Sequence, residues 1–134
     1  MQLTAYLNFD GQCREAFSTY EKVLGGRIQF IQTHGESPMK DQVSADWHDK
    51  IMHVTLEIDG GSLMGSDAPP GHYQKPQGLY VSIGVTSYDE GARIFRALSE
   101  GGRVNVPYDK TFWSPGFAML VDRFGTPWMI NCQA

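Results

Sequence analysis

The feature that most constrains the fold is a pattern that occurs twice in the chain, at an offset of 76 positions (3 to 79, and 25 to 101). Apolar residues alternate with polar ones over 3–9 and again over 79–85, and this period of two predicts a strand in each case. A predicted helix follows each strand and ends in the sequence Gly-Gly-Arg, at 25–27 and at 101–103. A chain that repeats one pattern in this way is expected to fold as two similar modules.

Each module continues with three more strand-like runs. In the first module they cover 27–32, 52–59 and 62–66, and a polar stretch at 34–50 separates the first two. In the second module a run after Arg103 leads through a loop to 116–122 and 126–132. The chain therefore reads βαβββ twice, and the predicted class is α+β, with the two repeats forming a paired-module, partly open barrel.

The segment between the modules has the composition of a linker. Residues 68–78 read APPGHYQKPQG and are rich in Pro and Gly. At 134 residues the chain has the length of one domain. We expect a single domain with modules at 1–67 and 79–134, joined by this linker.

Alternation along the strands predicts which side chains face away from the helices. If Val54 and Leu56 pack on the first helix, then His53, Thr55 and Glu57 point to the opposite face. The same reasoning, applied to every strand, gives a concave set: Thr4, Tyr6, Asn8, His53, Thr55, Glu57, Met64, Ser66, Tyr80, Ser82, Met129 and Asn131. This set has no Lys or Arg, which exposed strands often carry, and includes Met and Tyr, so a ligand pocket competes with an ordinary solvent-exposed face as its explanation.

Composition excludes several classes of function. Eleven basic and 15 acidic residues give a net charge of −4 with no basic face, so we expect no nucleic-acid partner. No apolar run is long enough to cross a membrane and no signal peptide is visible, so a cytoplasmic protein without a membrane partner is expected. Cys13 and Cys132 form no motif and are expected to be buried free thiols. The acidity also weighs against an anionic ligand.

The histidines do not form a metal motif. His53 and Glu57 have a spacing that brings side chains together on a helix, but on a strand they would lie roughly 13 Å apart. His34, His48 and His72 fall in polar loops, where solvated side chains are common. There is no HxH, CxxC or HExxH sequence, no Gly-rich phosphate loop and no GxSxG elbow. We therefore expect neither a metal nor a cofactor.

Several motifs, taken together, resemble those of the vicinal oxygen chelate superfamily. They are YLNFDG at 6–11, REAFSTYEKVLGG at 14–26, HVTLEIDGGSLMGSDAP at 53–69, TFW at 111–113 and VDRFGTPWMIN at 121–131. This superfamily includes glyoxalase I, extradiol dioxygenases, fosfomycin-resistance enzymes and bleomycin-binding proteins. The chain looks most like its PhnB-like branch, and the resemblance implies glyoxalase-like paired modules over the whole length.

The resemblance also bears on chemistry. The metal enzymes of the superfamily hold an ion at four positions that correspond here to Thr4 (or Ala5), Met64, Tyr80 and Met129. None of these is a ligand for a hard metal ion, and Met usually fills space. Similar sequences are sometimes labelled demethylubiquinone methyltransferases, but the chain lacks the Gly-rich loop that a methyl-donor nucleotide usually needs.

The first hypothesis is therefore a metal-independent protein that binds a small organic molecule in its concave pocket. The ligand-binding residues expected are Tyr6, Asn8, His53, Met64, Ser66, Tyr80, Trp113, Met129 and Asn131. Trp128 would add apolar area unless it belongs to the core.

Two alternatives remain open. One is a glyoxalase-type lyase or isomerase, with His53 as general base, Glu57 or Asp67 as its helper and Tyr80 as acid. The other is an interaction module without a ligand. Members of the superfamily are often homodimers, and the loop aromatic Trp113 would suit a dimer interface.

Overall fold

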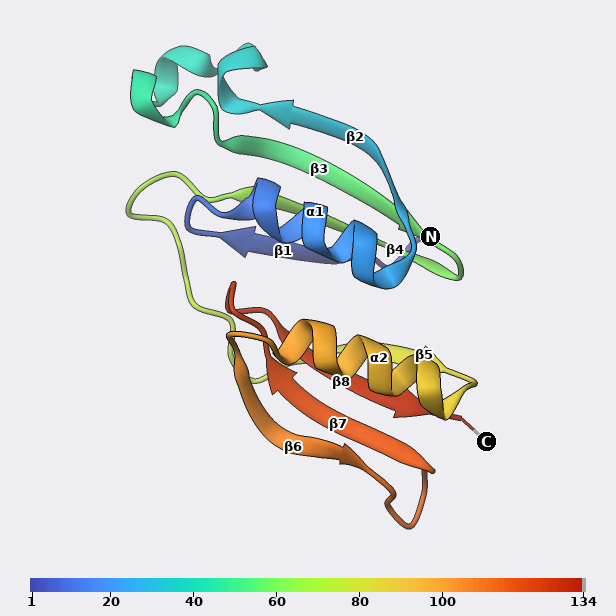
Figure 1. Ribbon diagram of the computed structural model, residues 1–134. Helices are drawn as coiled ribbons and strands as arrows, with labels where there is room; N and C mark the ends of the chain where they lie inside the picture. Colours follow the sequence, from blue (N-terminus) through green and yellow to red (C-terminus); the bar gives the residue numbers. More distant parts are fainter. Residues whose placement is uncertain (134) are drawn as a thin grey trace. The chain divides into compact units, whose positions relative to one another are not determined.

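The computed structural model describes residues 1–133 and contains two compact units, Met1–Gln74 and a second that begins at Lys75 (Figure 1). The elements of the first unit are β1 (Ala5–Phe9), α1 (Cys13–Leu24), β2 (Arg27–Thr33), the short 3₁₀ helices η1 (His34–Glu36), η2 (Lys40–Gln42) and η3 (Ala45–Trp47), β3 (Ile51–Ile58) and β4 (Gly61–Asp67). Those of the second are β5 (Val81–Val85), α2 (Tyr88–Ser99), β6 (Arg103–Asp109), β7 (Gly116–Val121) and β8 (Pro127–Cys132).

Each unit consists of a four-stranded sheet with an α-helix packed on it, and the two sheets have the same topology. The strand order is β1-β4-β3-β2 in the first sheet and β5-β8-β7-β6 in the second. The outer strand β1 runs parallel to β4, β5 runs parallel to β8, and the other neighbours are antiparallel. The predicted α+β class and the two βαβββ repeats are confirmed.

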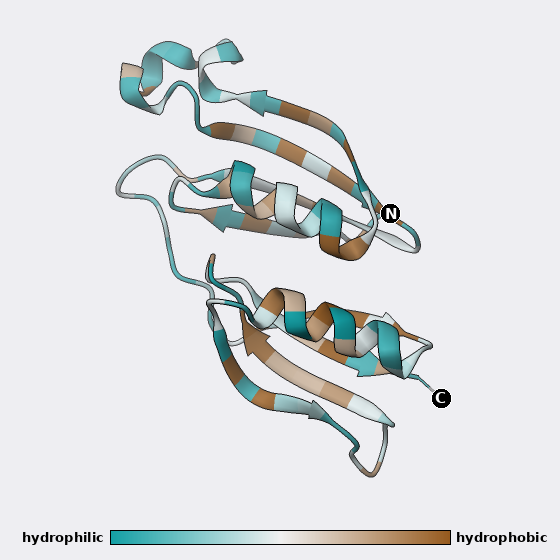
Figure 2. Ribbon diagram, in the orientation of Figure 1, coloured by the Kyte–Doolittle hydropathy of each residue, from teal (hydrophilic) through white to brown (hydrophobic). Residues whose placement is uncertain are grey.

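Alternation along β3 separates the core face from the open face, by which we mean the face of each sheet opposite its helix. Val54 and Leu56 are fully buried, whereas His53 and Thr55, which alternate with them, are half-buried. Figure 2 shows hydrophobic and hydrophilic residues alternating along this strand. Because α1 packs against β3 and β4, the buried set lies under the helix, as a period of two requires.

Close approach of α1 to the sheet depends on a glycine. Phe17 and Tyr20 are fully buried on the inner side of the helix. A Cβ atom built on Gly65 of β4 would lie 2.5 Å from Cε1 of Phe17. Helix α1 ends at Gly25, whose φ of 73° is a left-handed conformation that glycine adopts without steric cost.

A buried carboxylate joins the ends of three elements in the first unit. Asp67, at the end of β4, is 1% exposed. Its Oδ1 accepts hydrogen bonds from the backbone N–H groups of Gly11 and Cys13, both at 2.9 Å, and its Oδ2 accepts one from Ile51 at 2.8 Å. These bonds hold the turn before α1 and the start of β3 against the end of β4.

Asp122 has a comparable role in the second unit. It is 5% exposed, and its Oδ1 accepts hydrogen bonds from the N–H groups of Phe124 and Thr126, each at 2.9 Å. Its Oδ2 accepts one from Nε1 of the fully buried Trp128 at 2.8 Å. Trp128 therefore belongs to the core, where its one polar atom is satisfied, and not to the open face.

Tyr108 occupies a slot between α2 and β7. Its hydroxyl donates to the carbonyl of Tyr88 at 3.0 Å. Cβ atoms built on Gly91 and Gly116 would lie 2.2 Å and 2.5 Å from that hydroxyl oxygen, so both positions need glycine for the ring to fit. Burial, followed by the charges of Cys132 and Tyr88, raises the pKa of Tyr108 to about 12.

Three further expectations concern Leu3, the two cysteines and membrane-spanning segments. Leu3 is 94% exposed and precedes β1, so its predicted place in the first strand is wrong; pairing with β4 begins at Ala5. Cys13 and Cys132 are buried free thiols, as predicted. Burial raises the pKa of the Cys13 thiol, and the nearby Asp67 raises it further. No helix within residues 1–133 has the length and hydrophobicity needed to cross a membrane.

Candidate functional site

The open face of the first sheet carries a row of side chains in register. Tyr6 on β1 pairs with Met64 on β4, Met64 pairs with Thr55 on β3, and Thr55 pairs with Phe30 on β2. Residues in register on neighbouring strands have Cβ atoms about 5 Å apart. The row therefore places a phenol, a thioether, a hydroxyl and a phenyl ring next to one another.

His53 lies within a chain of hydrogen bonds on this face. Its Nδ1 is 3.0 Å from the Tyr6 hydroxyl, and its Nε2 is 3.0 Å from Oγ1 of Thr55. The rings of Tyr6 and Phe30 flank the imidazole, at centroid distances of 5.6 Å and 6.0 Å. A neutral imidazole donates from one nitrogen and accepts at the other, so these two hydroxyls satisfy both.

Asn8 and Ser66 form a second polar pair on the same face. They are in register on β1 and β4, and the Ser66 hydroxyl donates to Oδ1 of Asn8 at 3.1 Å. The structure thus brings the five predicted ligand residues of the first module to one face of one sheet. They are Tyr6, Asn8, His53, Met64 and Ser66.

The acidic helpers considered for His53 do not reach it. Glu57 is exposed near the other end of β3, where it is in register with Ser62 and Arg27. Both oxygens of Asp67 accept the backbone hydrogen bonds described above. The polar partners of His53 are therefore hydroxyls and not a carboxylate.

The residues at the superfamily's metal positions do not fit a hard metal ion. Met64 lies in register between Tyr6 and Thr55, and Met129 lies between Ser82 and Met119. Such thioether and neutral hydroxyl groups are poor ligands for ions that prefer carboxylate or imidazole. Within residues 1–133 no group of three or more His, Cys, Asp or Glu side chains is placed to hold an ion.

The open face of the second sheet has a buried acceptor without a donor. Asn131 on β8 is in register with Gly84 on β5 and Phe117 on β7. Its Oδ1 is buried and has no hydrogen-bond partner among the described residues. A buried acceptor left unpaired costs about 1–3 kcal/mol, so a ligand or water that donates to it would be favoured.

Trp113 lies next to Phe117, the register neighbour of Asn131. It lies in the loop before β7, and its ring is 5.2 Å from that of Phe117, which is in register with Asn131. Trp113 remains 55% exposed and its neighbour Phe112 96% exposed. The predicted residues Trp113 and Asn131 therefore both adjoin Phe117.

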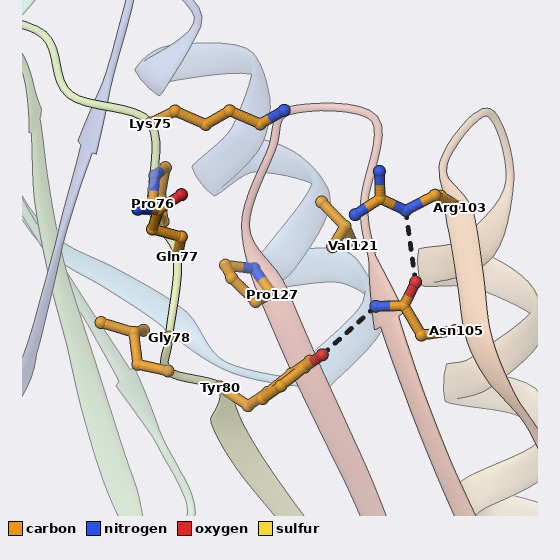
Figure 3. A pocket seen from close by; sticks show the side chains of 10 residues that line it. Lys75, Pro76, Gln77, Gly78, Tyr80, Arg103, Asn105, Val121 and Pro127 are labelled. Carbon is orange, nitrogen blue, oxygen red and sulfur yellow. Dashed lines mark hydrogen bonds between the residues drawn. The ribbon is translucent and has the colours of Figure 1, made fainter.

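A pocket of about 250 Å³ opens at the end of the second sheet where β5 and β8 begin (Figure 3). The side chain of Tyr80 extends toward Asn105, whose Nδ2 donates to the Tyr80 hydroxyl at 3.2 Å. The Nε of Arg103 in turn donates to Oδ1 of Asn105 at 3.2 Å. The residues that line the pocket are Lys75, Pro76, Gln77, Gly78, Leu79, Tyr80, Arg103, Asn105, Val121 and Pro127.

Sequence reasoning predicted Tyr80 as a ligand-binding residue of the concave face and missed Lys75, Arg103 and Asn105. Arg103 was visible as a marker of the repeat, but its neighbours in space were not. Asn105 falls between two register pairs, Val104 with Leu120 and Val106 with Met119. It is the extra residue of a β-bulge, and a bulge redirects side chains in a way that a period of two does not reveal.

The comparisons with known proteins agree with this architecture. The family model described as 3-demethylubiquinone-9 3-methyltransferase matches residues 1–131. The chain belongs to this family. It is similar to protein PA1353 from Pseudomonas aeruginosa, with 45% sequence identity. The crystal structure of that protein superposes with a TM-score of 0.91 and covers 99% of this chain and 98% of that one.

Two more distant structures show the extent of the fold. A putative 3-demethylubiquinone-9 3-methyltransferase, PhnB protein, from Bacillus cereus is 18% identical, with a TM-score of 0.83 over 99% of this chain and 100% of that one. A glyoxylase/bleomycin resistance protein/dioxygenase domain from Frankia is 13% identical, with a TM-score of 0.66 over 100% and 98%. At these identities the likeness concerns the fold, which is the vicinal oxygen chelate fold of paired βαβββ modules in its PhnB-like form.

Proposed function

We propose that this protein binds a small organic molecule on the open faces of its sheets, without help from a metal ion. The observation that carries the proposal is the hydrogen-bonded chain Tyr6–His53–Thr55, which lies beside the Phe30 ring and the Met64 thioether. Ligand sites combine apolar and aromatic surface with a few polar groups in fixed positions. Here neighbouring side chains fix those polar groups before any ligand arrives.

An ordinary solvent-exposed sheet face is less compatible with this arrangement. Around His53 the side chains on this face are neutral groups that bond to one another, and the charged residues Arg27 and Glu57 lie near the other end of β3. Tyr6 is 48% exposed although its ring lies against His53. A face that offers aromatic carbon and hydroxyl groups together favours an amphipathic ligand.

The geometry around His53 favours binding over base catalysis. A general base needs a nitrogen within hydrogen-bond reach of the proton that it removes. Both imidazole nitrogens already have a hydroxyl partner at 3.0 Å. A substrate would have to displace one of them, so the glyoxalase-type alternative has weaker support than binding.

The methyl transfer in the family's description has no matching site in the described residues. A methyl-donor nucleotide usually lies on a Gly-rich turn between a strand and a helix. Asp10, Gly11 and Gln12 join β1 to α1, and Thr86 and Ser87 join β5 to α2. Neither connection has the glycine spacing of that turn.

A fragment screen by thermal shift and tryptophan fluorescence tests the proposal. We expect fragments with an aromatic ring and a polar group to raise Tm and to bind saturably. Tyr6→Phe should weaken a hit about 3- to 10-fold, as loss of one hydrogen bond does. Tyr88→Phe is the matched control, because Tyr88 is 46% exposed and lies on α2. A screen without saturable hits, or hits equally weakened by both variants, would contradict the proposal.

A further inference from the structure

We infer that the pocket at the end of the second sheet binds an anionic group, a carboxylate or a phosphate, through Lys75 and Arg103. The inference deepens the proposed function and rests on it, because Tyr80 is one of the ligand-binding residues expected from the sequence and also lines this pocket. It adds the chemical class of the ligand: a small organic acid or phosphate ester.

The first argument is the charge inside the pocket. Lys75 and Arg103 are the charged residues among its described lining, and no Asp or Glu side chain accompanies them. Within residues 1–133 neither cation forms an ion pair. Asp122 follows the lining residue Val121, but its two oxygens already accept the hydrogen bonds of the turn and of Trp128. An anion entering the pocket would therefore meet two cations that lack a counter-charge.

The second argument is the orientation of the guanidinium. Nε of Arg103 donates to Asn105, and Asn105 donates to the Tyr80 hydroxyl. These two hydrogen bonds hold the Arg103 guanidinium in one orientation. The terminal nitrogens remain for an oxyanion, which Arg binds with two parallel hydrogen bonds. Figure 3 shows the side chains of Lys75 and Arg103 extending from opposite sides over Pro127 and Val121.

The third argument is the contrast with the first module. Arg27 holds the place in the repeat that Arg103 holds in the second module, at the start of β2. Arg27 is in register with Glu57 on β3, whereas Arg103 is in register with Val121 on β7. The arginine is thus in register with a carboxylate in one module and with an apolar side chain in the other, so Arg103 has no acidic register partner on the neighbouring strand.

The size and walls of the pocket define the rest of the ligand. A volume of about 250 Å³ is just below the range of roughly 300–1,000 Å³ that is usual for small-molecule sites. Pro76, Leu79 and Pro127 offer apolar surface next to the cations. The net charge of −4 belongs to the whole chain and does not describe this pocket, whose charged lining residues, Lys75 and Arg103, are both cations.

Nuclear magnetic resonance on the ¹⁵N-labelled full chain tests the inference. Inorganic phosphate and succinate are titrated separately, each against sodium chloride of equal ionic strength. We expect saturable shifts of the Asn105 side-chain amide, the Gly78 amide and the Arg103 Nε with one anion or both. Arg103→Gln and Lys75→Gln should each raise the Kd about tenfold, the effect of losing one charge-assisted hydrogen bond.

Matched variants separate this site from a general attraction of anions. Arg27→Gln removes the equivalent arginine and should leave the Kd unchanged, whereas Arg103→Lys keeps the charge and should have an intermediate Kd. Binding of phosphate alone or succinate alone identifies the source of the oxyanion. Shifts no larger than those with chloride, or equal binding by Arg103→Gln, would overturn the inference. If fragments still bind in a Tyr6-dependent way while neither anion binds saturably, the proposed function stands and this site is overturned.

Discussion

Replacement of Asp67 should distinguish a structural carboxylate from a catalytic one. The sequence allowed Asp67 as a helper for His53, but its oxygens accept three backbone hydrogen bonds, from Gly11, Cys13 and Ile51. Asp67→Ala would remove all three acceptors and leave N–H groups without partners. Each unpaired buried donor costs about 1–3 kcal/mol, and because Gly11 is half-buried, water can replace part of its bond.

We therefore expect Asp67→Ala to lower the free energy of unfolding by about 3–5 kcal/mol, a large share of the roughly 5–15 kcal/mol typical of a domain. Asp67→Asn keeps one oxygen, which can still accept from Gly11 and Cys13, but its amide would face the N–H of Ile51. Its cost should be smaller, about 1–3 kcal/mol. The expected order of stability is wild type, then Asn, then Ala.

Urea unfolding followed by circular dichroism measures these differences. Asp41→Ala, an exposed substitution in η2, is the control and should stay within about 0.5 kcal/mol of wild type. A loss below about 1 kcal/mol for Asp67→Ala would refute the structural role. So would an unchanged stability combined with an altered His53 titration, because that is the result expected of a helper that acts on the imidazole.

Four further predictions follow from single contacts. Gly65→Ala should cost about 1–3 kcal/mol in urea unfolding, because the new Cβ would lie 2.5 Å from Phe17; Gly84→Ala, whose nearest neighbour is Gln133 at 3.5 Å, should be tolerated. Tyr108 should deprotonate near its raised pKa of about 12 in an absorbance titration. Since the folded state holds this proton more tightly than the unfolded chain, stability should fall as pH rises from 10 toward 12, and Tyr108→Phe should remove that part of the slope. Trp128→Phe should cost about 2–4 kcal/mol, because it leaves Oδ2 of Asp122 without its indole donor and opens a cavity. Titration with Zn²⁺, Mn²⁺ or Ni²⁺, followed by mass spectrometry, should give no stoichiometric ion; one bound ion per chain would contradict the donor set at Met64 and Met129.

The fold could be predicted from the sequence because its signals are local and occur twice. Alternation along each strand and the Gly-Gly stops of both helices specify the βαβββ order without any tertiary information. The start of β1 was misplaced because Leu3 continues the alternation, whereas hydrogen bonding to β4 begins at Ala5. The local pattern identifies a strand, but pairing with the neighbouring strand decides where the strand begins.

For the candidate site, the sequence predicted which sheet face a side chain occupies but not which residues it bonds to. Alternation placed Tyr6, His53 and Met64 on one face, because a strand has two faces and the core occupies the other. It could not show that Asp67 is tied to three N–H groups or that a bulge directs Asn105 toward Tyr80. Those contacts join residues far apart in sequence, and the alternation of apolar and polar residues along a strand carries no information on them.

The two modules show how a repeated backbone can hold different chemistry. The end of β4 carries Asp67, whose register partner on β1 is Phe9, and the end of β8 carries Cys132, whose register partner on β5 is Val85. A carboxylate there ties together the first module, whereas the thiol is a small buried group. The start of β2 pairs an arginine with Glu57, while the start of β6 leaves its arginine beside Val121. Because hydrogen bonds between backbone groups hold both sheets, the same topology forms with different side chains at these matched positions. Differences between the modules are therefore where ligand specificity can arise, and Arg103 is the most direct of them to test.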